Sequence, residues 1–559
     1  MPDGRPGPGG FLRLLDKDRT VAGPSFNRWL VPPAALCMHL CIGMAYGFSV
    51  FWLPLSRAIG ITAPVACAEG TGLMHRLVIT TCDWDKPTLG WIYTLFFVFL
   101  GASAALFGPW LERVGPRRAG VVAAVCWCGG LAIAAAGVAW HRLWIVWLGA
   151  GVIGGIGLGI GYISPVSTLI RWFPDRRGLA SGLAIMGFGG GAMIGAPLAD
   201  LLMRRFAGPR SVGVWETLLA LAAIYFLVML LGAFAYRVPP PGWAPGAAAG
   251  GSAPAAAGSF TAAEAVRTRA FWLVWLVLCL NVSAGIGVIG MASPMLQEIF
   301  GGRLVGRDAA LDALDPADTA RVAAVAAGFT GLLSLFNILG RFFWSALSDR
   351  IGRRSLYMIF FAVGALLYAS VPALGHAGNV ALFCAVFCVI LSMYGGGFAA
   401  IPAYLADLFG TGSVGAIHGR LLTAWSVAGI LGPVLVNYVN QAQVAAGTPP
   451  ARAYDRTMLL LAGLLVAGGI ANLAVRSPRP APESPLPVSP LPVSPAPGDA
   501  PQGARASRTA AAETGGRAAA APGDWPLVAA FWLLVTLPML WGAWQTLSQA
   551  AALFRPTAP

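Results

Sequence analysis

Long apolar runs alternate with short polar connections along almost the whole chain. Most runs hold about 20 residues or more, the length an α-helix needs to cross roughly 30 Å of hydrocarbon. Because backbone polar groups in lipid must be hydrogen-bonded within the segment itself, we expect helices rather than isolated strands. The pattern predicts thirteen spans, near residues 29–55, 88–108, 120–140, 143–170, 179–202, 215–236, 270–296, 321–346, 356–375, 380–408, 417–441, 456–475 and 525–548.

Two low-complexity stretches divide these spans. Residues 238–258, rich in Pro, Gly and Ala, separate two groups of six spans. Residues 477–523, rich in Pro, Ala and Ser, have the composition of a tether before the last span. We therefore predict an N-terminal segment (1–28), a six-helix bundle (29–237), a linker (238–269), a second six-helix bundle (270–475), a tether (476–524) and an additional transmembrane helix (525–548).

Composition and charge support a membrane protein. The chain is 57% hydrophobic and only 11% charged, with a mean hydropathy of +0.71, which excludes an ordinary soluble protein. The net charge of +14 comes from short Lys and Arg clusters between spans, so we expect no nucleic-acid partner. Most clusters fall on the side of the N terminus, which predicts a bacterial inner-membrane protein with a cytoplasmic N terminus. Arg204, Arg205 and Arg210 dissent from this pattern.

Neither the cysteines nor any motif points to an enzyme. Seven of the nine cysteines lie in apolar runs and are expected to be small buried side chains. Cys67 and Cys82 share one polar loop, where they form a disulfide if the loop faces outward; the bonded and the free states both remain open. We find no metal-ligand cluster, no Walker-type loop and no triad-like spacing. We expect no cofactor, and energy from gradients rather than from ATP.

The two halves of the chain repeat at an offset of 237 residues. The run from Glu112 to Arg117 recurs as the run from Asp349 to Arg354. At the same offset Pro165 matches Pro402, Gly182 matches Gly419, and Gly195 matches Gly432. Several matches at one offset, between two six-span halves, indicate a duplicated bundle.

The repeated run resembles the motif of the major facilitator superfamily, Gly-x-x-x-Asp-Arg-x-Gly-Arg-Arg. The resemblance implies an all-α membrane fold of two six-helix bundles related by pseudo-two-fold symmetry, here with one extra C-terminal helix. A tight glycine turn lets a carboxylate meet arginines and a helix end, forming a gating latch; a solvated basic loop that only sets topology is the alternative. The latch residues would be Gly108, Glu112, Arg113, Gly115 and Arg117 in the first copy, and Asp349, Arg350, Gly352 and Arg354 in the second.

Polar residues that are not repeated are the candidates for a cargo site. Arg341 and Asn337 are four residues apart, hence on one helical face, and their counterparts are Ala104 and Leu100. An arginine inside a span costs about 2.5–3.5 kcal/mol on insertion scales, so it should face a cavity or a partner. No carboxylate lies well inside any span, so a carboxylate substrate can supply the counter-ion. The alternative is an arginine that snorkels to the membrane surface.

Longer stretches resemble the oxalate/formate antiporter family, over roughly residues 29–475. They include Gly161-Tyr162-Ile163-Ser164-Pro165, the run from Trp172 to Ala180, and Gly187-Phe188-Gly189-Gly190-Gly191. The resemblance implies a carrier of mono- or dicarboxylates in which Arg341 binds the substrate carboxylate, with Asn337 beside it and Tyr162 and Tyr394 lining the site. Family members that exchange oxalate carry a lysine in the eleventh helix, where this chain has Trp425. We therefore expect a monoanion such as lactate, formate or pyruvate rather than oxalate, although Trp425 also suits simple helix packing.

The coupling mechanism stays open. His39, inside the first span with Tyr46 and Ser49, is either a proton carrier or a hydrogen-bonded packing residue. Antiport and proton symport both fit, with a small carboxylate, the lipid bilayer and protons as partners of a monomer. The alternative functions are a major facilitator exporter of drugs or metabolites and a membrane sensor that does not transport.

Overall fold

The computed structural model describes residues 14–23, 25–61, 64–68, 71–240, 243, 259–478 and 525–550. Within these residues it is all-helical, with isolated β-bridges only, and thirteen helices are long and apolar enough to cross a membrane. The predicted fold class is therefore confirmed. Residues 1–13, most of the linker and residues 479–524 of the predicted tether lie outside the described part.

The first half contains six crossings. The first is a broken helix, because η2 (Arg28–Leu30) and α2 (Val31–Ile42) continue into a 3-10 segment, η3 (Gly43–Phe51), and then α3 (Trp52–Leu55). The fourth starts as α7 (Leu143–Val146) and a π-helical segment, η4 (Trp147–Gly154), before α8 (Gly155–Trp172). The others are α5 (Lys86–Val114), α6 (Pro116–Ala139), α9 (Arg177–Phe206) and α10 (Val214–Ala235).

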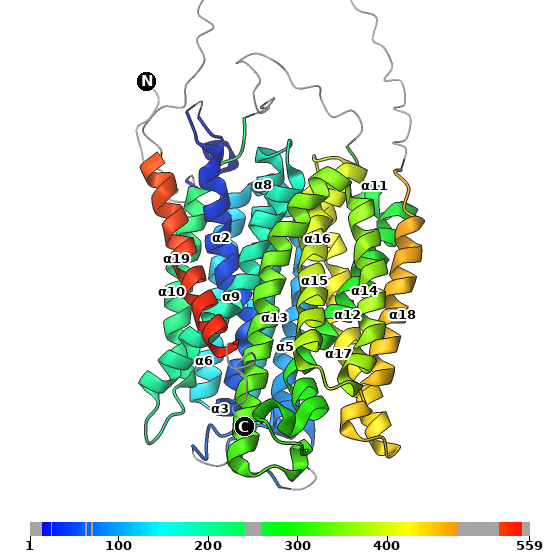
Figure 1. Cartoon of the computed structure of the whole chain (residues 1–559). Coiled ribbons are helices and arrows are strands. Elements are labelled where there is room, and N and C mark those ends of the chain that lie inside the picture. Colours follow the sequence, from blue (N-terminus) through cyan, green and yellow to red (C-terminus); the bar gives the residue numbers. More distant parts are fainter. Residues whose placement is uncertain are drawn as a thin grey trace, which may run out of the picture.

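The second half repeats this arrangement beside the first (Figure 1). Its eleventh crossing is interrupted at Leu422, between α16 and α17. Its helices are α12 (Arg269–Phe300), α13 (Pro316–Ile351), α14 (Arg353–His376), α15 (Val380–Phe409), α16 (Val414–Leu421), α17 (Thr423–Ala445) and α18 (Asp455–Leu473).

The halves meet along two seams, α9 against α13 and α5 against α16. The C-terminal ends of α5 and α13 lie on the face from which α2 starts, at the top of Figure 1. We call this side, which carries Glu112 and Asp349, the latch face, and the opposite side the cavity face. Each seam therefore brings one copy of the repeated motif to the latch face.

Two glycines allow the motif helices to reverse direction. Gly115 ends α5 with φ 86°, and Gly352 ends α13 with φ 82°. The left-handed region costs other L-residues roughly 1–2 kcal/mol, so glycine is the residue that fits both turns. The next helix then begins at once, with Pro116 at the first position of α6 and Arg353 at the first position of α14.

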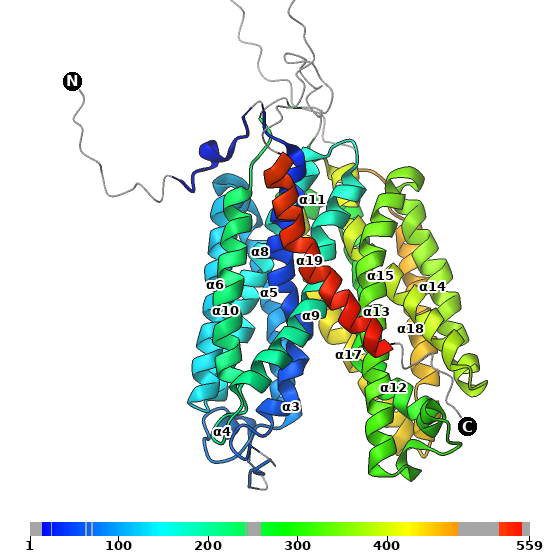
Figure 2. The ribbon, with the colours of Figure 1, turned by 60° about the vertical axis from the view of Figure 1, so that its left-hand side comes forward.

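The thirteenth helix, α19 (Trp525–Ala550), lies diagonally across the α9–α13 seam (Figure 2). It contacts the first half because the indole nitrogen of Trp532 donates to the carbonyl of Trp29 at 3.2 Å and Val535 packs against Leu36. It contacts the second half where Thr546 faces Gly331 of α13. One added helix thus contacts both bundles at a single seam.

Candidate substrate site and the two latches

A cavity of about 570 Å³ lies between the halves. It extends from Asn337, in the middle of α13, to Trp52 and Gly90, at the ends of their helices on the cavity face. Its volume is in the range of small-molecule sites. The polar side chains of its lining are uncharged: Tyr46, Ser49, Tyr93, Thr94, Ser293, Thr330, Ser334, Asn337 and Asn437.

Arg341 lies inside the bundle and does not snorkel, since its exposed fraction is 0%. Its Nε donates to the side-chain oxygen of Asn337 at 2.9 Å, one helical turn away, and its Nη1 donates to the carbonyl of Ile185 at 3.2 Å. Its Nη2 is buried with no hydrogen-bond partner among the described residues. The hydroxyl groups of Tyr46 and Tyr162 also lie near the guanidinium, but Nη2 itself makes no hydrogen bond to the described residues and remains an unused donor.

Arg341 lies directly beneath the floor of the cavity. Asn337, which accepts from it, and Gly189 of α9 both line the cavity. A Cβ added at Gly189 would lie 3.1 Å from the Nε of Arg341. Because glycine leaves this space free, the backbone of α9 comes against the guanidinium, next to the cavity.

No carboxylate neutralises Arg341 in the described part of the chain. None of the ion pairs there includes Arg341. The buried acids are elsewhere: Asp83 accepts backbone N–H groups of a loop, and Asp318 pairs with Arg307 near the cavity face. A desolvated charge without a partner is costly. A planar guanidinium with a free donor is suited to a carboxylate.

Aromatic rings surround the guanidinium. Its carbon lies 5.5 Å from the ring centre of Phe398 and 5.8 Å from that of Phe188, within cation–π range. Trp425 is fully buried in the same cluster, with its ring centre 4.5 Å from that of Phe398 and 5.3 Å from that of Tyr162. The structure thus brings Tyr162 and Trp425 to Arg341, together with two phenylalanines that the sequence did not single out.

Tyr394 joins this cluster through two contacts. Its hydroxyl lies 3.4 Å from that of Tyr46, which lines the cavity. Its ring packs edge-on against Phe398 with the centres 5.3 Å apart. All five candidate substrate residues therefore lie in one region between the halves.

His39 is fully buried and ties three helices together. Its Nδ1 contacts the carbonyl of Ala184 in α9, and its Nε2 lies 3.1 Å from the carbonyl of Tyr162 in α8. Its ring stacks on that of Tyr162 with the centres 5.1 Å apart. These contacts fit the packing role, and a role in proton coupling stays a prediction.

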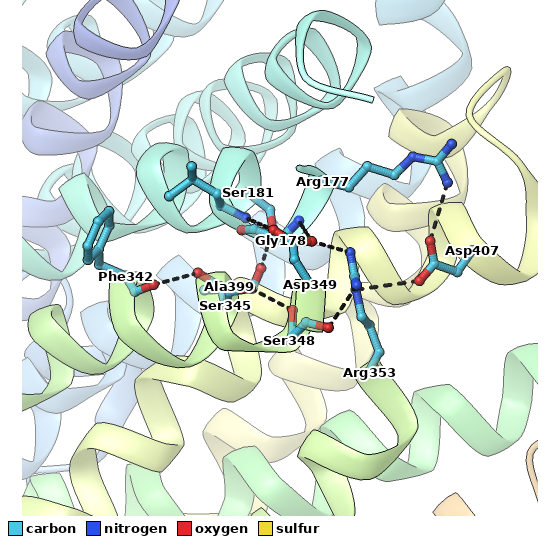
Figure 3. A network of polar contacts seen from close by, with 11 residues as sticks. Arg177, Gly178, Ser181, Phe342, Ser345, Ser348, Asp349, Arg353, Ala399 and Asp407 are labelled. Carbon is cyan, nitrogen blue, oxygen red and sulfur yellow. Dashed lines mark hydrogen bonds and ion pairs between the residues drawn. The ribbon is translucent and has the colours of Figure 1, made fainter. Parts of the chain in front are cut away.

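The α13 latch is a network of charges on the latch face (Figure 3). Asp349 accepts from the backbone N–H groups of Gly178 and Leu179, at 2.8 and 2.9 Å, where α9 begins. The carboxylate also pairs with Arg353 at 2.6 Å. A carboxylate at a helix N-terminus meets both free N–H groups and the positive end of the helix dipole, so Asp349 fastens α13 to α9.

A second acid extends this latch across the seam. Asp407, near the end of α15, pairs with Arg353 of its own half at 3.4 Å and with Arg177 of the first half at 3.3 Å. Asp407 had not been predicted, because only the folded chain brings it between two arginines from different helices.

The α5 latch has the same backbone contact but fewer charges. Glu112 accepts from the N–H of Ala416, in the first turn of α16, at 3.1 Å. At the repeat offset, Pro116 stands where the second copy has Arg353, and Ile170 stands where it has Asp407. Lys17 donates to the backbone carbonyl of Glu112 at 2.8 Å rather than to its carboxylate.

The motif arginines named from the sequence do not pair with the two motif acids. Arg117 donates to the carbonyls of Leu14 and Tyr236, and Arg354 donates to that of Leu473, so both fasten chain segments to helix ends. Arg113 and Arg350 are exposed. Gly108 provides close packing instead, since a Cβ there would lie 2.8 Å from the Cα of Ala416.

The loop on the cavity face holds the two polar-loop cysteines. The structure joins Cys67 and Cys82 in a disulfide. Beside it, the Nε2 of His141 donates to the carbonyl of Cys82 at 2.8 Å, and the imidazole stacks on Trp84 with the ring centres 4.1 Å apart. Burial lowers the pKa of His141, which favours the neutral ring in this contact.

Sequence comparison now decides the family. The model of the Major Facilitator Superfamily matches residues 34–433, and again residues 317–557. The chain belongs to this superfamily. It is therefore an integral membrane protein of a transporter family, which agrees with the two bundles and the repeated motif.

Two relatives and one solved structure extend this result. The chain is 25% identical to the oxalate:formate antiporter of Oxalobacter formigenes, over 73% of this chain and 83% of that protein. It is 23% identical to apicoplast pyruvate carrier 1 of Toxoplasma gondii, over 68% and 78%. The E. coli fucose:proton symporter FucP, in its outward conformation, has the same fold, with a TM-score of 0.53 at 14% identity over 80% of this chain and 99% of that one.

Proposed function

We propose that this chain carries small monocarboxylate anions such as lactate, formate or pyruvate across the membrane by alternating access, with the latch face in the cytoplasm. The observation behind this proposal is Arg341, a buried cation with an unused donor beneath a cavity that has no charged lining. A carboxylate that enters from the cavity face would neutralise the guanidinium and accept its free N–H, as the carboxylate of an Asp or Glu does in an ion pair.

A monoanion fits better than a dianion because the site offers one positive charge. Trp425, fully buried among aromatic rings, stands in the eleventh helix at the position where the family resemblance implies a lysine in members that exchange oxalate. The second carboxylate of a dianion would lie among these aromatic rings without a positively charged partner, and burying an unpaired charge is costly. We therefore place oxalate below lactate, formate and pyruvate among the substrates. The two relatives, an oxalate:formate antiporter and a pyruvate carrier, support a carboxylate cargo.

Both exchange and proton symport agree with a lone arginine. In exchange, a bound monoanion neutralises Arg341 and the loaded site crosses as a neutral unit; in symport, a proton crosses with the anion. His39 is the candidate to carry a proton, because it contacts the backbone of Tyr162 next to the site. A His39→Gln variant would lose proton-driven uptake but keep exchange if this assignment is right, whereas equal loss of both would assign His39 to packing.

The test is counterflow of labelled lactate, formate, pyruvate and oxalate in proteoliposomes. Arg341→Ala is expected to lower monocarboxylate counterflow by at least about 100-fold, since charge-assisted hydrogen bonds contribute about 1.5–3 kcal/mol each. Arg321→Ala, which removes an exposed arginine from the same helix, is the matched control and should leave counterflow unchanged.

Other outcomes would favour the alternatives. Carboxylate flux that survives Arg341→Ala would remove the cargo assignment. Drug efflux without carboxylate flux would identify an exporter, and carboxylate binding without any flux would identify a sensor.

A further inference from the structure

A second cavity, of about 840 Å³, lies on the latch face beside the α5 latch. Both halves line it, with basic side chains on each side of the seam. Lys17, Arg113 and Arg171 come from the first half and Arg420 from the second, and hydroxyl groups of Thr261, Thr411 and Ser413 complete its polar lining.

The four cations have no acidic partners. None of them forms an ion pair within the described residues. Glu112 is the single acid in the lining, and its carboxylate accepts from the N–H of Ala416 while it attracts Lys17 and Arg171 from a distance. Arg171 donates to a backbone carbonyl, that of Gly412, at 3.3 Å. Among the described residues that line it, the cavity therefore has three more positive charges than negative ones.

The other seam shows what is missing here. There Asp407 lies between Arg177 of the first half and Arg353 of the second, and so joins the halves. The position that corresponds to Asp407 holds Ile170, which is fully buried and apolar. On the α5 side no acid stands at this position, and the next residue, Arg171, lines an open cavity with basic walls from both halves.

We propose that a compact multivalent oxyanion of the phosphate type binds in this cavity and closes the α5 latch, as Asp407 closes the α13 latch. Arginine and lysine from both halves would contact its oxygens, and the hydroxyl groups of Thr411 and Ser413 would donate to it. This site is separate from the cargo cavity and does not depend on which anion is transported.

Binding of the anion would be coupled to closure of the latch face. Because its walls belong to both halves, it exists only while the latch face is closed. An anion that binds one conformation shifts the equilibrium toward it by the difference in affinity. Phosphate, pyrophosphate or a phosphorylated metabolite would therefore hold the carrier open to the cavity face.

The first experiment measures binding of pyrophosphate to the purified full-length chain in detergent, as a saturable rise in thermal stability at constant ionic strength. Arg113→Gln and Arg420→Gln are each expected to weaken binding and so raise the half-saturating pyrophosphate concentration by about ten-fold, the effect of one charge-assisted contact. Arg350→Gln is the matched control, because Arg350 is the counterpart of Arg113 at the repeat offset and is exposed at the other seam.

The controls decide between a site and a general charge effect. Equal weakening in Arg350→Gln, or protection that does not saturate, would overturn the proposal. The same measurement in nanodiscs with and without phosphatidylglycerol separates the two sources of the ligand. Loss of pyrophosphate binding only when the anionic lipid is present would identify the lipid headgroup as the occupant, whereas unchanged binding would identify the soluble anion.

A second experiment reports the conformation directly. Ser334→Cys places a thiol in the lining of the cargo cavity. Pyrophosphate should speed its reaction with a water-soluble maleimide by a few-fold, and Arg113→Gln should shift that increase to about ten-fold higher pyrophosphate concentrations. Labelling that is slowed or unaffected by saturating pyrophosphate would contradict closure of the latch face by the anion.

Discussion

The two seams share a backbone arrangement but differ in their charges. At each, a motif carboxylate accepts N–H groups at the start of the facing helix, Asp349 from Gly178 and Leu179 and Glu112 from Ala416. The α9–α13 seam also holds Arg341 and a four-member charge network, whereas the α5–α16 seam has Ala104 at the matching position and no ion pair at its latch among the described residues. The two copies therefore share the backbone contacts at the latch face, whereas the buried arginine and the ion pairs belong to one of them.

The largest difference is expected when the two motif acids are neutralised. Asp349→Asn removes the ion pair with Arg353 and weakens two backbone hydrogen bonds, which should shift the equilibrium toward an open latch face by about 3 kcal/mol, roughly 100-fold. Glu112→Gln removes the charge from the hydrogen bond with the N–H of Ala416 and should shift the equilibrium by about 1 kcal/mol. Maleimide labelling of Ser334→Cys in each background measures both shifts. Equal shifts would show that the seams are energetically alike.

A smaller effect is expected from the glycines at which the seams come closest. A Cβ at Gly419 would meet the backbone carbonyl of Ala104, whereas at Gly182 the nearest atom is the hydroxyl of Ser345, which can rotate away, and the backbone carbonyl of Arg341 is farther, at 2.9 Å. Gly419→Ala should therefore cost about 2 kcal/mol and Gly182→Ala about half as much, the usual range for overpacking. Thermal unfolding of the two variants in one detergent gives the comparison, and a larger loss at Gly182 would contradict this assignment of rigidity.

The smallest effect is expected from removing α19, which covers only the α9–α13 seam. A chain that stops after Pro478 would lose the Trp532–Trp29 hydrogen bond and the packing of Val535. Lipid can replace most of these apolar contacts, because helix association in a bilayer has little hydrophobic driving force. We expect less than about 1 kcal/mol of lost stability and carboxylate counterflow within a few-fold of the full chain. Loss of counterflow with retained folding would instead make α19 part of the transport cycle.

The sequence predicted the crossings well because each depends on local apolarity. The span predicted at 179–202 is α9, Arg177–Phe206, and the last one at 525–548 lies within α19. It did not predict the interruption of the first crossing at Gly43 or of the eleventh at Leu422, since both segments remain apolar throughout. Helix geometry inside an apolar run is decided by packing, which a hydropathy pattern does not contain.

Residue spacing alone could predict the site only where its residues are neighbours along the chain, and Tyr162, Tyr394 and Trp425 were named from the family resemblance instead. The spacing of Asn337 and Arg341 predicted one helical face, and the structure joins the two side chains by a hydrogen bond. Phe188 and Phe398 come from different halves, so no spacing connects them with Arg341. Asp407 was not predicted either, because its partners Arg177 and Arg353 are distant from it along the chain. The repeat offset could have shown that the first half lacks two of these charges, because Pro116 and Ile170 occupy the positions that correspond to Arg353 and Asp407.

A single buried positive charge also makes the conformation of the empty carrier sensitive to the membrane potential. Arg341 has no acid beside it in the described structure, so the vacant site carries its charge to whichever side it faces. Moving one elementary charge through 100 mV is worth about 2.3 kcal/mol. With the latch face in the cytoplasm, as proposed, a negative interior draws the vacant site inward, while a bound monoanion cancels the charge and frees the loaded step from voltage. Arg341, which is proposed to bind the cargo, would then also determine the side of the membrane to which the empty site opens.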